Sequence, residues 1–133
     1  MEYILLNLKT TRNGCSLRIP ESCPENLRAA LSQVFCCAIS VTWCGALELY
    51  SREQFEALKD RIRALPSPAV REQMEVLLLT SCLMEMTAHT ICVPMMLAAA
   101  VGLEGRAALV LDDGRLCLMR PERAQSGRRD ETD

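Results

Sequence analysis

The chain has 133 residues, a formal net charge of −2 and an apolar fraction of one half, so it fits one ordinary domain or two very small units with a shared core. The charge gives no global attraction to nucleic acid, and one Trp, two Tyr and two Phe are too few for base-stacking platforms. No apolar run approaches the length of a membrane span and the first residues do not read as a secretion leader, so we expect a cytoplasmic protein without membrane contact.

Residues 1–50 are predicted to form a small β-rich unit. Asn13–Gly14 is a dipeptide typical of hairpin turns, and Pro20 ends the strand that follows it. In chain order, the predicted elements are strands at 3–9 and 15–19, a helix at 24–31, and strands at 34–41 and 46–50, with a turn at 43–45.

Residues 51–79 are predicted to form a helical hairpin, and they are the most strongly specified part of the chain. Ser51 can cap the first helix together with Gln54, and Ser67 can cap the second, with Pro68 in its first turn. The apolar residues of the first helix recur at spacings of three and four: Phe55, Leu58, Ile62 and Leu65. The second helix places Val70, Met74, Leu77 and Leu78 on one side. We expect a structural connector whose apolar faces pack against each other or against a sheet.

After the hairpin the order of elements repeats in residues 80–123. Pro94 closes a strand as Pro20 did, Gly102 ends a short helix, and Asp113–Gly114 is a strong hairpin-turn signal. The predicted elements are strands at 82–86 and 90–93, a helix at 95–101, and strands at 107–111 and 115–119.

An internal duplication accounts for this repeat. Residues 45–53 match residues 114–122 in spacing and apolar pattern. Each half is too small to bury both faces of its sheet, so the halves are expected to pack together. Residues 124–133 are polar and of mixed charge, and we expect them to be disordered.

The eight cysteines and the single histidine show no zinc-ligand spacing, so no metal and no cofactor are expected. Most of the cysteines lie in apolar runs, which predicts reduced structural thiols. A disulfide framework or a thiol-based sensor is the alternative. The cysteines are Cys15, Cys23, Cys36, Cys37, Cys44, Cys82, Cys92 and Cys117.

The usual catalytic constellations do not occur in the sequence, so we expect that the protein is not an enzyme. There is no second histidine, no glycine-rich phosphate loop and no nucleophile elbow. Glu48 is interpreted as an exposed strand position, and Asp112–Asp113 as turn chemistry.

In order and spacing, more than in identities, the chain from Tyr3 to Arg123 resembles the MraZ family of bacterial division and cell-wall cluster regulators. The closest passages are residues 45–50, the helix with Phe55, Leu58 and Ile62, and residues 68–79 and 93–103. The resemblance implies an α+β fold of two AbrB-like swapped-hairpin β-modules, packed as a pseudo-twofold, double-ψ-like barrel with a helical hairpin between them. The modules would be residues 1–50 and 80–123, joined by residues 51–79 and followed by a tail at 124–133.

This sequence departs from the family's Asp-x-x-Gly-Arg motif. In the family, the basic loop that contains this motif faces DNA. In the second half Glu85, Ala88 and His89 stand where the family has Asp, Gly and Arg, and in the first half only Gly14 can be aligned. Lys9, Arg12 and Arg18, in a stretch without acidic residues, are therefore the candidate DNA contacts, together with His89. A solvated strand face, and a hydrogen-bonded loop histidine, are the structural alternatives.

Two functions follow from the resemblance. The first is a MraZ-like transcriptional regulator that binds promoter DNA as a ring-like homo-oligomer at the nucleoid. The second is a degenerate assembly protein that no longer binds DNA and acts through protein contacts, for example with a full MraZ paralogue. The lost motifs and the acidic balance favour the second.

Overall fold

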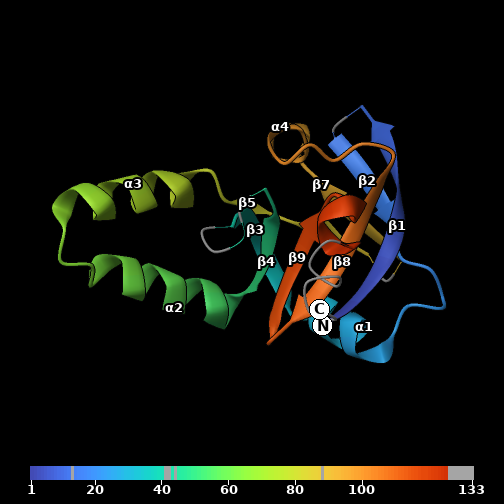
Figure 1. The fold of residues 1–133 in the computed structure, drawn as a ribbon, viewed down its shortest axis with the longest axis horizontal. Coiled ribbons are helices and arrows are strands. Elements are labelled where there is room, and N and C mark those ends of the chain that lie inside the picture. The colour runs from blue at the N-terminus through green and yellow to red at the C-terminus, as the bar shows by residue number, and fades with distance from the viewer. Residues whose placement is uncertain (13, 41–42, 44, 88, 126–133) are drawn as a thin grey trace.

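The structure is a computed structural model that describes residues 1–12, 14–40, 43, 45–87 and 89–125, and it has an α+β fold (Figure 1). The strands are β1 (Glu2–Thr11), β2 (Gly14–Arg18), β3 (Val34–Ile39), β4 (Leu47–Ser51), β5 (Cys82–Leu83), β6 (Glu85–Met86), β7 (Thr90–Val93), β8 (Arg106–Asp112) and β9 (Arg115–Met119). The helices are α1 (Glu25–Leu31), α2 (Arg52–Arg63), α3 (Pro68–Leu79) and α4 (Met95–Ala100), and residues 121–125 are also helical.

The strands form one curled antiparallel sheet in the order β5-β3-β4-β9-β8-β1-β2-β7-β6. The two outer strands, β5 and β6, are separated in the chain by Met84 alone, so the backbone itself links the two edges of the sheet. The single strand predicted over residues 82–86 is therefore wrong in detail. Residues 82–83 pair with β3 and residues 85–86 pair with β7, which breaks the strand at Met84.

The pairing pattern is unchanged when the two halves of the chain are exchanged. The first strand of each half pairs with the third strand of the other, as β1 does with β8 and β5 with β3. The second strands of the two halves pair with each other, as β2 does with β7, and so do the fourth strands, β4 and β9. The register agrees: Leu17, three residues before Pro20, lies opposite Ile91, three residues before Pro94. Each half thus supplies hydrogen-bonding partners that the other lacks.

The inner face of the curled sheet holds the main hydrophobic core. Strand residues alternate between faces, and Leu17, Leu47, Ile91 and Leu109 are inside with no exposed surface. Two smaller clusters cover parts of the outer face, one around Val110 and the other beneath α2. Because both faces of β4 are covered, its side chains are buried on both sides.

The helical hairpin begins as predicted, with a capping box at Ser51. The Gln54 N–H donates to Ser51 Oγ at 3.1 Å, and the Ser51 N–H donates to Gln54 Oε1 at 3.0 Å. At the second helix the Val70 N–H donates to Ser67 Oγ at 3.4 Å. Both predicted caps are confirmed.

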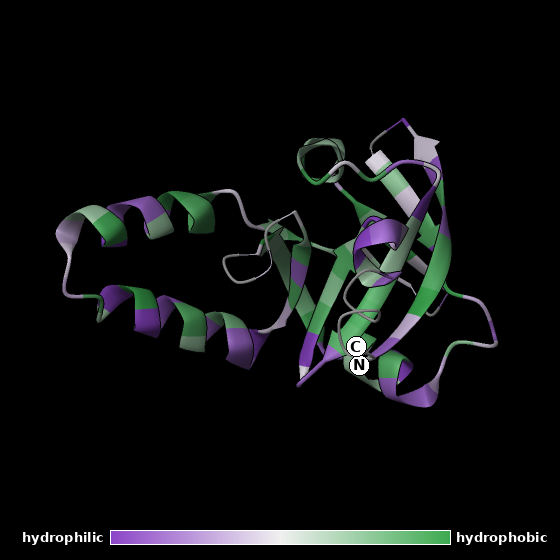
Figure 2. Cartoon of the chain, viewed as in Figure 1, coloured by the Kyte–Doolittle hydropathy of each residue, from purple (hydrophilic) through white to green (hydrophobic). Residues whose placement is uncertain are grey.

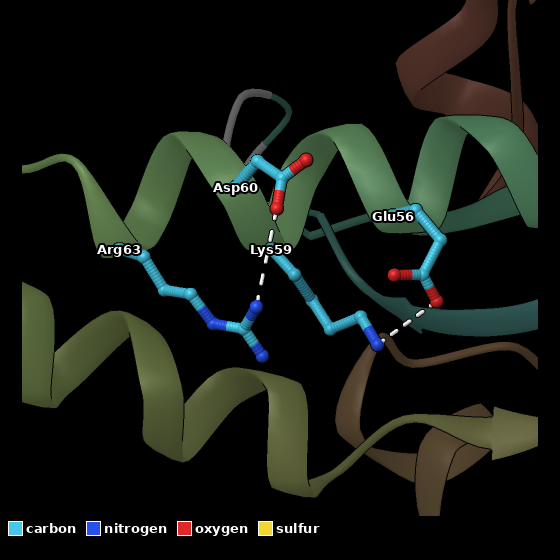
Figure 3. A network of polar contacts seen from close by, with 4 residues as sticks. All are labelled: Glu56, Lys59, Asp60 and Arg63. Atoms are coloured by element: carbon cyan, nitrogen blue, oxygen red, sulfur yellow. Dashed lines mark ion pairs between the residues drawn. The ribbon is translucent and has the colours of Figure 1, made fainter.

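The hairpin projects from one side of the sheet, next to β3 and β4 (Figure 1). Helix α2 buries Leu58 and Ile62 against β3 and β4, whereas α3 has no buried residue. Polar and apolar residues alternate along both helices (Figure 2). Lys59 pairs with Glu56 at 3.0 Å and Arg63 with Asp60 at 3.9 Å along α2 (Figure 3). Such partly exposed pairs add little stability.

The Asp113–Gly114 turn is confirmed, since both residues have positive φ, of 50° and 78°, as a tight two-residue hairpin requires. Ala124, expected at the start of a disordered tail, is instead packed against the sheet. The predictions that fall on Asn13, Val41, Cys44, Ala88 and residues 126–133 lie outside the described residues. Within the described part of the chain, none of the helices has the length and apolar character that a membrane crossing needs.

Candidate nucleic-acid interface

The outer face of β1, β2 and β7 carries two of the predicted DNA contacts side by side. Lys9 lies opposite Ser16, and Arg18 lies two residues farther along β2, opposite Thr90. Lys9 and Arg18 are therefore diagonal neighbours across the strand pair, about 7–8 Å apart at the backbone. Both side chains are exposed, because the alternate residues of these strands fill the core.

Arg12 lies at one end of this face, in the turn between β1 and β2. The last registered pair before the turn is Thr11–Gly14, and Thr11 Oγ1 donates to the Gly14 carbonyl at 3.1 Å. Gly14 is required by close packing: a Cβ atom there would lie 2.4 Å from the Val93 carbonyl oxygen. The β2–β7 contact thus fixes the base of the turn that presents Arg12.

His89 lies at the opposite end. Its carbonyl accepts a 2.7 Å hydrogen bond from the Ile19 N–H, and its own N–H donates to Thr87 Oγ1 at 3.2 Å, while its side chain is exposed. From Gly14 to Ile19 the strand advances five residues, or about 17 Å. The structure therefore brings Lys9 and Arg18 together and places Arg12 and His89 beyond them on opposite sides. We call these four residues the basic strip.

The positive charge of the basic strip comes almost entirely from the first half of the chain. Counted from Pro20 and Pro94, Arg18 corresponds to Cys92 and Ser16 to Thr90. Strand β7 itself, Thr90–Val93, contains no cation. Glu85 has Cys92 as its backbone partner.

Glu48 is the polar residue that sequence reasoning misplaced. It is 8% exposed, not an exposed strand position, because the outer face of β4 is covered. Ser40 Oγ donates to Glu48 Oε1 at 3.0 Å, and the Tyr50 hydroxyl is hydrogen bonded to the same carboxylate. Leu47 and Leu49 alternate with Glu48 and Tyr50, a pattern typical of a strand with one solvent-exposed face. No local signal in the sequence therefore indicates that Glu48 is buried.

Burial around Glu48 perturbs two neighbouring acids. Desolvation first, and the charge of Glu48 second, raise the pKa of Cys117 to about 12. The same causes, in the same order, with the hydrogen bond to Glu48, raise the pKa of Tyr50 above its usual range. Both groups therefore keep their protons to a higher pH in the folded state than in the unfolded chain.

A cavity of about 260 Å³ lies between this part of the sheet and the helical hairpin. Its walls include Leu58, Ile62 and Met74 on the apolar side, and Glu48 and Arg115 on the polar side. Among the described residues, no three His, Cys, Asp or Glu side chains are placed to hold a metal ion.

Comparison with known proteins gives no family assignment. The chain matches no protein-family model, and no curated protein matches it.

Proposed function

We propose that this chain is a MraZ-like DNA-binding regulator that acts as a homo-oligomer in the cytoplasm, at the nucleoid. The observation that carries the proposal is the strand pairing, which is unchanged when the two halves are exchanged. Two AbrB-like swapped-hairpin modules in a double-ψ-like barrel would have this property. The helical hairpin inserted between the halves supports the same interpretation.

The basic strip would contact the DNA backbone. Lys9 and Arg18 are exposed neighbours on one sheet face, and Arg12 extends that face at a turn held by backbone contacts. His89 would add a contact when protonated. A symmetric oligomer would repeat the strip, so several weak sites would act on one DNA molecule.

The expected salt dependence can be worked out per chain. Each neutralised phosphate contributes roughly −0.9 to the slope of log affinity against log salt, so Lys9, Arg12 and Arg18 give about −2.7. Affinity should then fall roughly 40-fold between 50 and 200 mM salt. Without Arg12 and Arg18 the slope becomes about −0.9 and the loss roughly 3.5-fold.

A salt series of gel shifts on promoter DNA tests the proposal. The double variant Arg12→Ala/Arg18→Ala should bind more weakly and with a flatter slope than the wild type. The matched control is Arg61→Ala/Arg63→Ala, which removes the same charge from exposed positions on α2. If the first variant keeps the wild-type affinity and slope, the basic strip is not the contact surface.

The second candidate function is assembly without DNA binding, in which the chain associates with itself or with a full MraZ paralogue. Two observations favour it. Strand β7 contributes no cation to the basic strip. Helix α3 exposes apolar side chains that contact with a partner would bury. Val76 is 58% exposed and Leu79 is 84% exposed.

A heparin column at low salt, with a mass measurement in solution, separates the two functions. A DNA-binding oligomer should be retained and elute as the salt rises. An assembly protein should flow through and still be oligomeric. A monomer would contradict both.

A further inference from the structure

Two cysteines lie directly opposite each other at one edge of the sheet. In the antiparallel pair β3–β5, Cys37 is the registered partner of Cys82. Directly opposite residues of such a pair have Cα atoms about 4.5–5.5 Å apart, which lies within the range of about 4.4–6.8 Å found across disulfides.

The two thiols also share a face of the sheet. Cys37 and Cys82 both pack in the inner core cluster. Cys36, next to Cys37 in the chain, points to the outer face and packs beneath α2. Cys92 is exposed, but its registered partners are Ser16 and Glu85. The register therefore selects one pair.

The two members of the pair differ in accessibility. Cys37 is fully buried, and burial raises its pKa to about 12, so it is a poor target for an oxidant. Cys82 is only half-buried, and its Sγ donates a weak hydrogen bond to the Thr80 carbonyl at 3.6 Å. An oxidant from solution reaches Cys82 first.

We propose that Cys37 and Cys82 form an oxidative modification site, in which a peroxide converts the two thiols into a cross-strand disulfide. In the first step the Cys82 sulfur takes one oxygen from hydrogen peroxide, giving a sulfenic acid and one water. In the second step the Cys37 sulfur attacks the Cys82 sulfur and loses its proton, the S–S bond forms, and the S–O bond breaks to release a second water. Direct opposition of the two residues, not a low pKa of Cys37, makes the second step feasible.

The consequence concerns the segment Cys82–Met86, which links the two edges of the sheet. On its β3 side it is held by two registered residue pairs and by a 3.4 Å hydrogen bond from the Met84 N–H to the Phe35 carbonyl. So few bonds allow local opening. A disulfide would fix this segment to β3 and with it the end of α3, because α3 ends only three residues before Cys82.

The test uses the reduced full chain treated with one equivalent of hydrogen peroxide. Peptide mapping by mass spectrometry without reductant should find Cys37 joined to Cys82 and the intact mass lowered by two hydrogen atoms. Dithiothreitol should reverse both changes. Hydrogen exchange of the backbone amides of residues 82–86 should be at least roughly tenfold slower in the oxidised protein.

Matched variants sharpen the result. Cys36→Ser should form the same disulfide in the same yield, and Cys82→Ser should not form it. If Cys82 is found joined to another cysteine, or as a sulfinic acid beside a free Cys37 thiol, the proposal is wrong. Should a variant fail to fold, the wild-type protein still decides, provided that the linked peptide is fragmented between the adjacent Cys36 and Cys37 to assign the bond to one of them.

Discussion

Replacement of Ile62 by alanine tests whether α2 is held against the sheet by apolar contact. Ile62 is 4% exposed and belongs to the apolar cluster that also contains Leu58, Cys36, Ala38 and Tyr50. Truncation of a buried isoleucine to alanine destabilises a protein by about 2–5 kcal/mol. Ile62 already borders a cavity of about 260 Å³, so its surroundings are not tightly packed and the lower half of that range applies. We expect a loss of about 2–3 kcal/mol in the free energy of unfolding.

Urea denaturation followed by circular dichroism measures this loss. Ile62→Val should cost about 0.5–1.5 kcal/mol, because most of the side chain remains. The control is Val76→Ala on α3, where the side chain is 58% exposed and the effect should stay within about 0.5 kcal/mol. If Ile62→Ala is no more harmful than Val76→Ala, α2 is not docked and the cluster beneath it contributes nothing to folding.

Three further predictions concern single sites. Gly14→Ala should destabilise the fold more than Gly105→Ala in urea titrations. At Gly105 only the positive φ opposes a side chain, at about 1–2 kcal/mol, whereas at Gly14 the Cβ would also collide with the Val93 carbonyl. Ser51→Ala should cost about 1 kcal/mol and lower the thermal midpoint, with full recovery in Ser51→Asp, which caps equally well. Cys117, whose pKa is raised by burial and by the nearby Glu48, stays protonated in the folded state while the unfolded chain ionises. The contribution of Cys117 to stability should therefore be fully present below pH 9 and be lost above it by up to about 1.4 kcal/mol per pH unit, and Cys117→Ala should remove that part of the decline. An unchanged slope in the variant would contradict this assignment.

Local sequence signals predicted those elements whose formation depends on a few neighbouring residues. The capping box at Ser51, the cap at Ser67 and the Asp113–Gly114 turn each satisfy backbone groups within three residues, so short patterns suffice. The repeat found from Pro20 and Pro94 also predicted which strands correspond. The register of β2–β7 agrees with it, because the paired residues Leu17 and Ile91 are equally distant from these two prolines.

Features that depend on distant neighbours could not be read from the sequence. Glu48 appeared exposed because β4 alternates like a half-buried strand, but both faces of β4 are covered and Glu48 is 8% exposed. The break at Met84 arises because β5 and β6 pair with strands from different parts of the fold. The sequence pattern predicted the residues of the basic strip but not their arrangement. In the structure Lys9 and Arg18 are neighbours and His89 lies apart from them.

A single polypeptide that carries both copies of a repeated unit has a freedom that two identical subunits lack. In a dimer of one gene product every residue appears twice, so a cation placed on one copy must appear on the other. A chain that carries both units does not have that constraint, and here Arg18 and its counterpart Cys92 differ chemically while they occupy equivalent positions in the strand register. One copy is thereby free to specialise in recognition while the other takes up a separate role.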